Sequence, residues 1–368
     1  MKLRKDIWQR ICLNDFCIIQ RGNIITKNTI LDGNIPVIAS AIGPSYYHNT
    51  SNRVANTITI SCSGNAGYVD FYKIPIYASD CITIEPKDRN KNDVFFIYFL
   101  IKSLENRIKG FQRGTAQKHI YPKDLAPIEI LLPDLIDQKQ IAALFQSIET
   151  ALEQVDGQEK NLKKLQKTLM NGLLSKEPEF GNLLSSKNCT ATTFGEIAEC
   201  DKKYPEHEKE VERFVGLEFI EADNFQLQGW GEIANGTTFS KRFLKGDVLF
   251  GKRRAYLKKV AVADFDGICS GDILVIRAKA KKMLQGLLPY YISADAFIQH
   301  AVSTSAGSLS PRTKWKDLAD LEVSIPDPNT QSTILEVLQK LDKTVNQLKK
   351  QKTTLKNLKQ KLLNEILG

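Results

Sequence analysis

The sequence has few of the features that mark membrane, secreted or disulfide-rich proteins. Its longest apolar run, 94–101, is far shorter than the roughly twenty residues that a membrane span requires. The charged segment 1–10 leads into no apolar signal core, so we expect no secretion. The seven cysteines include no C-x-x-C pair, which predicts reduced, mostly buried thiols and no zinc knuckle. We therefore expect a cytoplasmic protein.

Motifs for catalysis and cofactor binding are also scarce. The sequence has no P-loop, no glycine-rich nucleotide-binding turn and no Asn-Pro-Pro-aromatic tetrapeptide of the adenine methyltransferases. Asp80, Glu85 and Lys87 resemble the acidic and E-x-K elements of metal-dependent nucleases. Because both acids would lie on one strand edge, with a proline inside the E-x-K string, we favour a structural role for them. We predict no catalytic residue, no metal ligand and no cofactor in this chain.

Four histidines are widely separated and show no metal-ligand spacing; they are His48, His119, His207 and His300. His119 lies in a glycine loop that occurs twice in the chain. Arg312 or Thr313 stands near its place in the second copy. This exchange indicates a polar contact and argues against a catalytic histidine.

What the sequence does contain is positive charge and an internal repeat. A formal net charge of +9 and an isoelectric point near 9.0 favour a polyanionic partner, although a cationic surface alone is a weak sign. The 368 residues give room for about two domains. Two amphipathic helices with heptad spacing are predicted, at 133–178 and 326–368.

The apolar positions of the two predicted helices correspond at a constant offset of 193 residues. In the first helix they are Ile141, Phe145, Ile148, Leu152, Val155, Leu162 and Leu169. In the second they are Ile334, Leu338, Leu341, Val345, Leu348, Leu355 and Leu362. Identities outside the heptads keep the same offset, because Gly114, 123–126, Pro133 and Gln138 recur as Gly307, 316–319, Pro326 and Gln331. The chain is therefore an internal duplication.

Each copy is predicted to begin with a mixed globular unit. In the first unit we expect strands at 56–61, 68–72, 81–85 and 128–132, turns at 33–36, and a helix that begins at Asn92 or Asp93 and ends near Gly110. In the second we expect strands at 247–250, 273–276 and 321–325 and a helix at 288–302. The segment 179–192 is predicted to be a polar linker. The segment 21–56 has no visible relative in 206–245, so one scaffold is expected to present two different recognition surfaces.

Polar and basic residues in loops beside glycines are the candidates for nucleic-acid contact. Guanidinium groups can hold phosphate or read guanine through two hydrogen bonds, although a solvated charge is the alternative for any single residue. In the first unit the candidates are Ser63, Asn65, Arg113, Gln117 and Lys118. In the second they are Lys252, Arg253, Arg254, Tyr256, Arg312 and Lys314.

Three segments carry a resemblance to a known family. They are Gly114 to Gln117 with the closing stretch to Pro133, the helix start Gln138 to Ala142, and the string Cys269 to Ile273. In these segments, and over nearly its whole length, the chain resembles the specificity subunit of type I restriction-modification systems.

The resemblance implies an α+β fold with an internal pseudo-twofold repeat. Two target recognition domains, mainly β with a few helices, would occupy 1–132 and 193–325. Two long antiparallel coiled-coil spacer helices would occupy 133–178 and 326–368, with the linker 179–192 between the first helix and the second domain.

The resemblance also implies a DNA-binding role without catalysis by this chain. Each recognition domain would bind one half of a bipartite double-stranded DNA target, and the helices would set the gap and dock two methyltransferase subunits. Two restriction subunits would complete the assembly. S-adenosylmethionine, ATP and magnesium would all be on partner subunits.

Alternatives from the residues alone remain. Heptads most often form a homodimer interface, and a coiled-coil interaction protein without a nucleic-acid role would show no salt-dependent DNA affinity. A stand-alone nuclease using Asp80, Glu85 and Lys87 would cleave DNA with magnesium and no partner.

Overall fold

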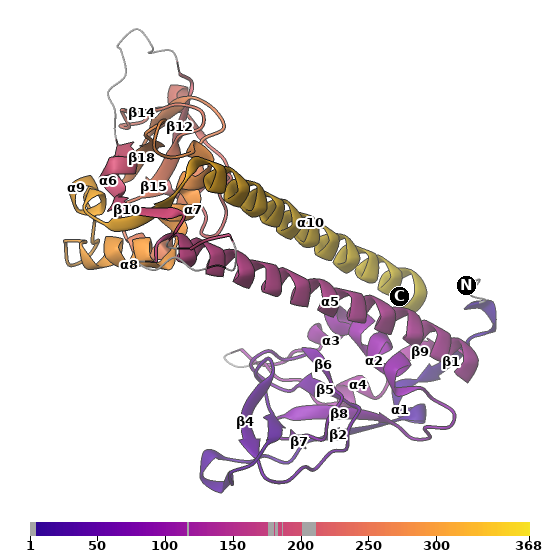
Figure 1. Cartoon of the computed structure of the whole chain (residues 1–368). Coiled ribbons are helices and arrows are strands. Elements are labelled where there is room, and N and C mark those ends of the chain that lie inside the picture. The colour runs from indigo at the N-terminus through magenta and orange to yellow at the C-terminus, as the bar shows by residue number, and fades with distance from the viewer. Residues whose placement is uncertain (1–4, 116–117, 176–179, 181–182, 186, 201–210) are drawn as a thin grey trace. The chain divides into compact units, whose positions relative to one another are not determined.

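The chain forms two compact units, each of which contains one globular region and part of both long helices (Figure 1). The computed structural model describes residues 5–115, 118–175, 180, 183–185, 187–200 and 211–368. Unit 1 consists of residues up to 156 together with 350–368, and unit 2 of 157–349. Within the described residues, no helix is long and apolar enough to cross a membrane.

Unit 1 begins and ends its globular region in one small antiparallel sheet. Strand β1 (Gln9–Cys12) pairs with β9 (Glu129–Leu132), in register from Gln9 opposite Leu132. The pairing places the end of the globular region directly before helix α5 (Leu135–Leu173). The short helix α1 (Leu13–Phe16) follows β1 directly in the chain, and the short helix α4 (Pro122–Leu125) precedes β9.

Two further sheets build the body of unit 1. The larger has the order β2-β8-β5-β6 and consists of Cys17–Arg21, Cys81–Pro86, Thr57–Ser61 and Val69–Tyr72. The smaller has the order β4-β3-β7 and consists of Pro44–His48, Ile35–Ile38 and Tyr77–Ala78. Strands β3 and β7 are parallel, and the other neighbours are antiparallel.

Helix α2 (Val94–Ser103) connects this body to the long helices of unit 1. Its start is fixed by Asp93, whose carboxylate accepts a hydrogen bond from the Phe96 amide at 2.9 Å, as expected of an N-cap residue. The ring centroid of Phe99 lies 5.0 Å from that of Phe145 on α5. A short helix, α3 (Glu105–Lys109), follows. The apolar run that the sequence shows at 94–101 is therefore core.

Unit 2 has the same plan. Its closing pair is β10 (Cys189–Thr193) with β19 (Glu322–Pro326), followed by helix α10 (Pro328–Leu367). The larger sheet, β11-β18-β15-β16, consists of Ala198–Cys200, Ile273–Ala278, Val248–Gly251 and Val260–Val262. The smaller, β13-β12-β17-β14, consists of Gly231–Glu232, Arg213–Val215, Gly267–Cys269 and Lys241–Phe243. The helices of the globular region are α6 (Phe194–Ile197), α7 (Leu288–Ser293), α8 (Asp295–Ser303) and α9 (Trp315–Ala319).

The repeat extends further than the sequence shows. In each unit the larger sheet has the same strand order, and the smaller sheet contains one parallel pair, β3 with β7 and β12 with β17. Both smaller sheets are built partly from 21–56 or 206–245, the segments that show no sequence likeness. The parallel pair is therefore a shared feature that the sequence does not show, because strand pairing uses backbone groups and tolerates different side chains.

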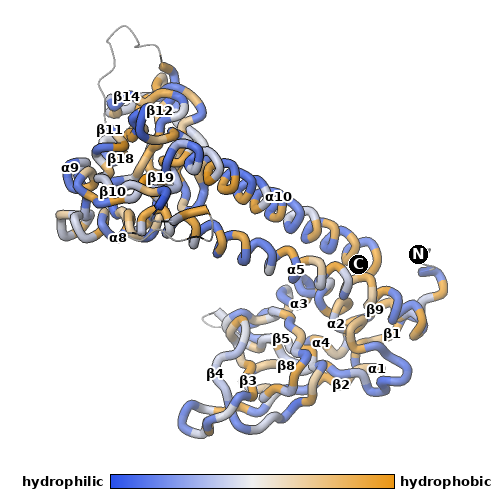
Figure 2. The backbone as a smooth tube through the Cα atoms, in the orientation of Figure 1, coloured by the Kyte–Doolittle hydropathy of each residue, from blue (hydrophilic) through white to orange (hydrophobic). Residues whose placement is uncertain are grey.

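The two long helices bury the heptad stripe. Every predicted apolar position on α5 and α10 is buried or half-buried, and none is exposed; Figure 2 shows apolar and polar residues alternating along both helices. Within unit 1, Lys352 pairs with Asp156 and Lys359 with Glu149; within unit 2, Gln166 bonds to Asp342. In all three pairs the two residue numbers add up to 508, as in an antiparallel register.

Four element predictions need correction. The helix predicted to end near Gly110 is two helices, α2 and α3, because the backbone of Leu104 between them leaves the helical conformation. The linker predicted at 179–192 contains most of strand β10, whose threonine-rich sequence suits a strand and which pairs with β19. The helix predicted at 288–302 is two helices, because Ala294 between them has extended backbone angles. The turn predicted at 33–36 ends early, since β3 begins at Ile35.

Candidate nucleic-acid interface

The basic candidates of unit 2 lie on two loops that the fold joins. The first, 252–259, connects β15 to β16, and the second, 304–314, follows α8. The Thr313 amide donates to the Lys252 carbonyl at 3.1 Å, and the Arg254 amide donates to the Pro311 carbonyl at 2.8 Å. Candidates almost sixty residues apart in sequence thus form one surface. We call these two segments the paired loops of unit 2.

A carboxylate that the sequence alone does not single out lies between the paired loops. Asp272 immediately precedes β18, and its carbonyl accepts a hydrogen bond from the Lys252 amide at 2.9 Å. Its side chain accepts two bonds from Arg312, from Nε to Oδ1 at 2.6 Å and from Nη2 to Oδ2 at 3.2 Å. Arg253 Nη1 lies 3.6 Å from Oδ2. The Arg312 hydrogen bonds, followed by the charges of Arg312 and Arg253, hold the pKa of Asp272 below its ordinary value.

The basic side chains of the paired loops remain accessible. Arg254, Arg312 and Lys314 are exposed, and Lys252 and Arg253 are half-buried. The five basic candidates of the paired loops therefore accompany the Asp272 carboxylate on this surface. Tyr256 is 54% exposed beside them, so an aromatic face is available next to guanidinium groups. Such a surface can hold phosphates and offer hydrogen-bond donors to base edges.

Unit 1 has equivalent paired loops, which are 62–68 between β5 and β6 and, before α4, the described residues 111–115 and 118–121. The Cys62 amide donates to the Asp80 carbonyl at 3.4 Å, and the Ile120 amide donates to the Cys62 carbonyl at 3.0 Å. These bonds repeat those of Lys252 with Asp272 and Thr313. Arg113 and His119 exchange backbone hydrogen bonds, as Ala306 and Arg312 do in unit 2.

One glycine explains part of the sequence repeat. Gly114 and Gly307 follow the first bridge residue of the second loop in their units, and both have φ of +112°. A residue with a Cβ rarely adopts this backbone conformation. The identity seen in the sequence therefore preserves the shape of the loop.

Asp80 in unit 1 takes the place of Asp272. Its Oδ2 accepts from the Ser63 hydroxyl at 2.6 Å, and its Oδ1 accepts from Arg21 Nη2 at 2.9 Å. Burial alone would raise the pKa of Asp80, but the hydrogen bonds from Ser63 and Arg21, with the nearby charges of Arg21 and His119, hold it below its ordinary value. Arg21 was not selected from the sequence.

The other candidates of unit 1 differ in how they are presented. Ser63 is only 3% exposed and its hydroxyl donates to Asp80, so it fits a loop anchor better than the DNA contact we expected. Asn65 is exposed and donates to the Ser40 carbonyl at 3.4 Å. Arg113 is exposed and lies 2.7 Å from Asp124, and Lys118 is exposed. Gln117 lies outside the described residues.

The nuclease alternative is not supported by the contacts of its residues. The Asp80 carboxylate is held by Ser63 and Arg21, and Glu85 lies 3.9 Å from Arg89. The Lys87 backbone amide donates to the Phe16 carbonyl. In the part of the chain that the structure describes, no group of three or more His, Cys, Asp or Glu side chains is placed to hold a metal ion.

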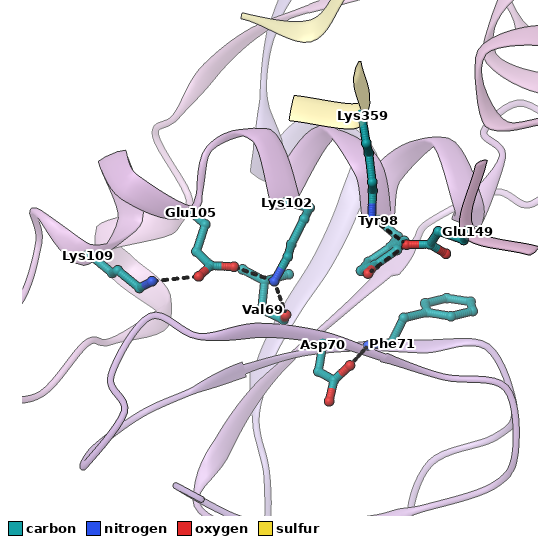
Figure 3. A network of polar contacts seen from close by, with 9 residues as sticks. All are labelled: Val69, Asp70, Phe71, Tyr98, Lys102, Glu105, Lys109, Glu149 and Lys359. Carbon is teal, nitrogen blue, oxygen red and sulfur yellow. Dashed lines mark hydrogen bonds and ion pairs between the residues drawn. The ribbon is translucent and has the colours of Figure 1, made fainter. Parts of the chain in front are cut away.

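A second repeated arrangement fixes each globular region on the long helices. In unit 1, Glu149 Oε1 accepts from the Tyr98 hydroxyl at 3.5 Å and from Lys359 Nζ at 2.7 Å (Figure 3). In unit 2, Asp342 accepts from the Tyr290 hydroxyl, and from Gln166 Nε2 at 2.6 Å. Each set joins α2 or α7 to both long helices. Burial and then the adjacent carboxylate raise the pKa of both tyrosines, so their hydroxyls remain donors at neutral pH.

The repeated glutamines also have a structural explanation. The side chain of Gln138 is 1% exposed, donates to the Pro133 carbonyl at 2.9 Å and accepts from the Asp93 amide at 2.9 Å. Gln331 is 3% exposed, donates to the Pro326 carbonyl and accepts from the Leu284 amide, both at 2.9 Å. Each amide satisfies buried backbone groups where a long helix begins.

A comparison with family models identifies the repeated domain of this chain. The model "Type I restriction modification DNA specificity domain" matches residues 5–164 and again 188–357. The chain belongs to this family. The two matched ranges each contain one closing strand pair, one set of paired loops and most of one long helix.

Known proteins similar to this chain include named type I specificity subunits. The MjaVIII specificity subunit of Methanocaldococcus jannaschii is 23% identical, over 98% of this chain and 92% of the relative. The EcoDI specificity subunit of Escherichia coli is 24% identical, over 94% of this chain and 83% of the relative. Both relatives are called specificity subunits, and the likeness to each covers nearly the whole of this chain.

Solved structures show the same fold. The S subunit of the type I restriction-modification system from M. genitalium superimposes with a TM-score of 0.67 at 18% identity, covering 99% of this chain and 97% of that one. A chain from a structure of complex assembly and conformational transition in the type I R-M system gives a TM-score of 0.55 at 16% identity, covering 98% and 97%. The α+β fold with two long helices is thus confirmed for this specificity-domain protein.

Proposed function

We propose that this chain gives a type I restriction-modification assembly its DNA sequence specificity, with each unit binding one half of a bipartite target. One observation carries the proposal most directly. Equivalent paired loops occur in both copies of the specificity domain, and in both they present basic side chains to solvent. Two different surfaces on one repeated scaffold suit two different half-targets.

The chemistry of the loops supports contact with DNA through both backbone and bases. Exposed Arg254, Arg312 and Lys314 in unit 2, and Arg113 and Lys118 in unit 1, can neutralise phosphates. Guanidinium forks can also donate two hydrogen bonds to guanine, and Asn65 can pair with adenine. The partner subunits would perform the chemistry on the selected base, so this chain is proposed to make and break no bond.

The long helices are proposed to fix the gap between the half-targets. Helix α5 has 39 residues and α10 has 40, so each extends about 60 Å at 1.5 Å per residue. The same helices are proposed to dock two methyltransferase subunits, which would bring S-adenosylmethionine. Two restriction subunits would add ATP- and magnesium-dependent cleavage. A target on the chromosome implies a cytoplasmic location for the assembly.

The test combines the full chain with methyltransferase subunits from the same organism and a library of random DNA duplexes. We expect modification of a two-part motif and salt-dependent DNA binding. Modification of the same sites without this chain would contradict the proposal. The pure chain with magnesium and DNA is the matched test of the nuclease alternative, and cleavage there would favour that alternative.

A further inference from the structure

We propose that Asp80 and Asp272 are equivalent positioning residues, each of which holds the DNA-contacting loops of its unit in one arrangement and so sets how strictly that unit reads its half-target. The inference rests on the proposed function and deepens it. Neither aspartate is proposed to contact a base. Both act through the side chains that they hold.

The equivalence of the two aspartates is geometric. Each immediately precedes the strand β8 or β18, and each accepts, at its backbone carbonyl, the amide of the first residue of the paired loops. That first residue, Cys62 or Lys252, in turn accepts a backbone hydrogen bond from the second loop. The carboxylates therefore stand at the same point of a repeated framework, where both loops are within reach.

In unit 2 the carboxylate orients two arginines. Both of its oxygens accept hydrogen bonds from Arg312, and Arg253 is the second cation on Oδ2. Arg253 also donates from Nη2 to the Ser310 hydroxyl at 3.0 Å. Arg253 belongs to the first loop, and Arg312 and Ser310 to the second. A guanidinium has five N–H donors, so Arg312 keeps donors for DNA after two are directed to Asp272.

In unit 1 the same position holds one cation and one hydroxyl. Asp80 accepts from Ser63 of the first loop and from Arg21 at the end of β2. The second loop has His119 at the place that Arg312 occupies in unit 2. Asp80 therefore holds fewer cations than Asp272 does. Loss of the carboxylate is expected to weaken discrimination less in unit 1 than in unit 2.

A direct base contact by Asp272 is the main alternative. A carboxylate can accept a hydrogen bond from the amino group of cytosine. However, the Asp272 side chain is only 21% exposed, while those of Arg253 and Arg312 are 40% and 46% exposed. The arginines are therefore presented to a DNA ligand, and the carboxylate lies behind them.

Loss of the Asp272 carboxylate is expected to change DNA binding in a way that a general loss of protein stability would not. In Asp272→Asn, the two guanidinium groups lose the negative charge and one of the two acceptor oxygens that orient them, but keep their own charge. They can then contact phosphates of any DNA sequence, so the nonspecific DNA affinity is expected to increase. That affinity is also expected to decrease more steeply as the salt concentration is raised. Discrimination at the bases read by unit 2 falls. The backbone hydrogen bonds between the paired loops remain, so the fold is retained.

The experiment uses the full chain in complex with its methyltransferase subunits, and sequencing of the modified positions in a random duplex library. For Asp272→Asn we expect at least about tenfold weaker discrimination at one or more positions of one half of the motif, with the other half unchanged. For Asp80→Asn we expect a smaller loss, confined to the opposite half. Asp320→Asn removes an equal charge from an exposed position after α9 and is expected to leave both halves unchanged.

The outcomes separate this inference from the function on which it rests. If the wild-type complex modifies no two-part motif, the proposed function fails. If the wild type shows the motif and folded Asp272→Asn shows the same motif with the same strictness, the positioning role is contradicted. Equal relaxation of both halves contradicts it as well. Thermal unfolding checks the fold of each variant, and Asp272→Ser replaces the Asn variant if that one does not fold.

Discussion

Buried glutamines at the starts of the long helices show how single side chains join the elements of each unit. We predict that Gln331→Ala lowers the free energy of unfolding of unit 2 by about 2–4 kcal/mol, because the Leu284 amide and the Pro326 carbonyl lose a buried partner. Urea unfolding followed by tryptophan fluorescence measures this. Gln339→Ala, at an exposed position on the same helix, is the matched control and is expected to change stability by less than about 0.5 kcal/mol. Equal effects of the two substitutions would contradict the account.

Asp295 gives a prediction about pH. A hydrogen bond from Lys258, with others from Lys167 and Asn171, holds the pKa of Asp295 well below its ordinary value. A carboxyl whose pKa is lowered by folding stabilises the fold above the unfolded-state pKa of about 3.9, and this contribution is lost as the pH falls toward the folded-state pKa.

Asp295→Asn is therefore expected to lower stability by about 1 kcal/mol at pH 6 and by progressively less below pH 4. Unfolding of both proteins at several pH values measures the difference. A difference that grows as the pH falls would contradict the assignment.

At the scale of elements, the polar contacts of Glu149 in unit 1 and of Asp342 in unit 2 join each globular region to the long helices. We call each set of contacts a junction, and the two junctions can be compared. Glu149→Leu leaves Lys359 without its carboxylate, and the Lys359 side chain is only 18% exposed. We expect a loss of about 3 kcal/mol in the stability of unit 1.

Lys359→Gln, by contrast, gives unit 1 the amide that unit 2 has at Gln166, and we expect a loss below about 1 kcal/mol. Denaturant unfolding of both variants tests the comparison. The junction model fails if Lys359→Gln is as damaging as Glu149→Leu.

The elements that the sequence predicts well are those with a strong periodic or capping signal. Heptads locate α5 and α10, alternating β-branched residues locate β5 and β8, and Asp93 marks the start of α2. Strand β10 and the smaller sheets are missed because they are short and held by long-range pairing, which leaves little local pattern.

The candidate site shows the same limit at the level of contacts. The loops were found from charge and glycine, which are local features. Their pairing, and the places of Asp80, Asp272 and Arg21 between them, depend on backbone hydrogen bonds between segments far apart in sequence. The string 269–273 marked the position of Asp272 but carried no sign of its partners.

At the scale of the whole molecule, the spacer proposal predicts a change in the DNA target. Deleting 157–163 together with 345–351 removes one heptad from each helix and keeps the register in which paired residue numbers match. Both junctions, at Glu149 and Asp342, are retained. Each helix becomes about 10 Å shorter. We expect the gap in the motif to shrink by roughly three base pairs at 3.4 Å each, as measured by sequencing modified bases; an unchanged gap would contradict the spacer role.

This chain is proposed to choose the DNA sequence on which its partner subunits act. The most direct test maps modified bases across the genome of cells with and without the gene for this chain, with the partner genes intact. We predict a two-part motif that is modified only when the chain is present. A motif that stays modified in its absence would contradict the account.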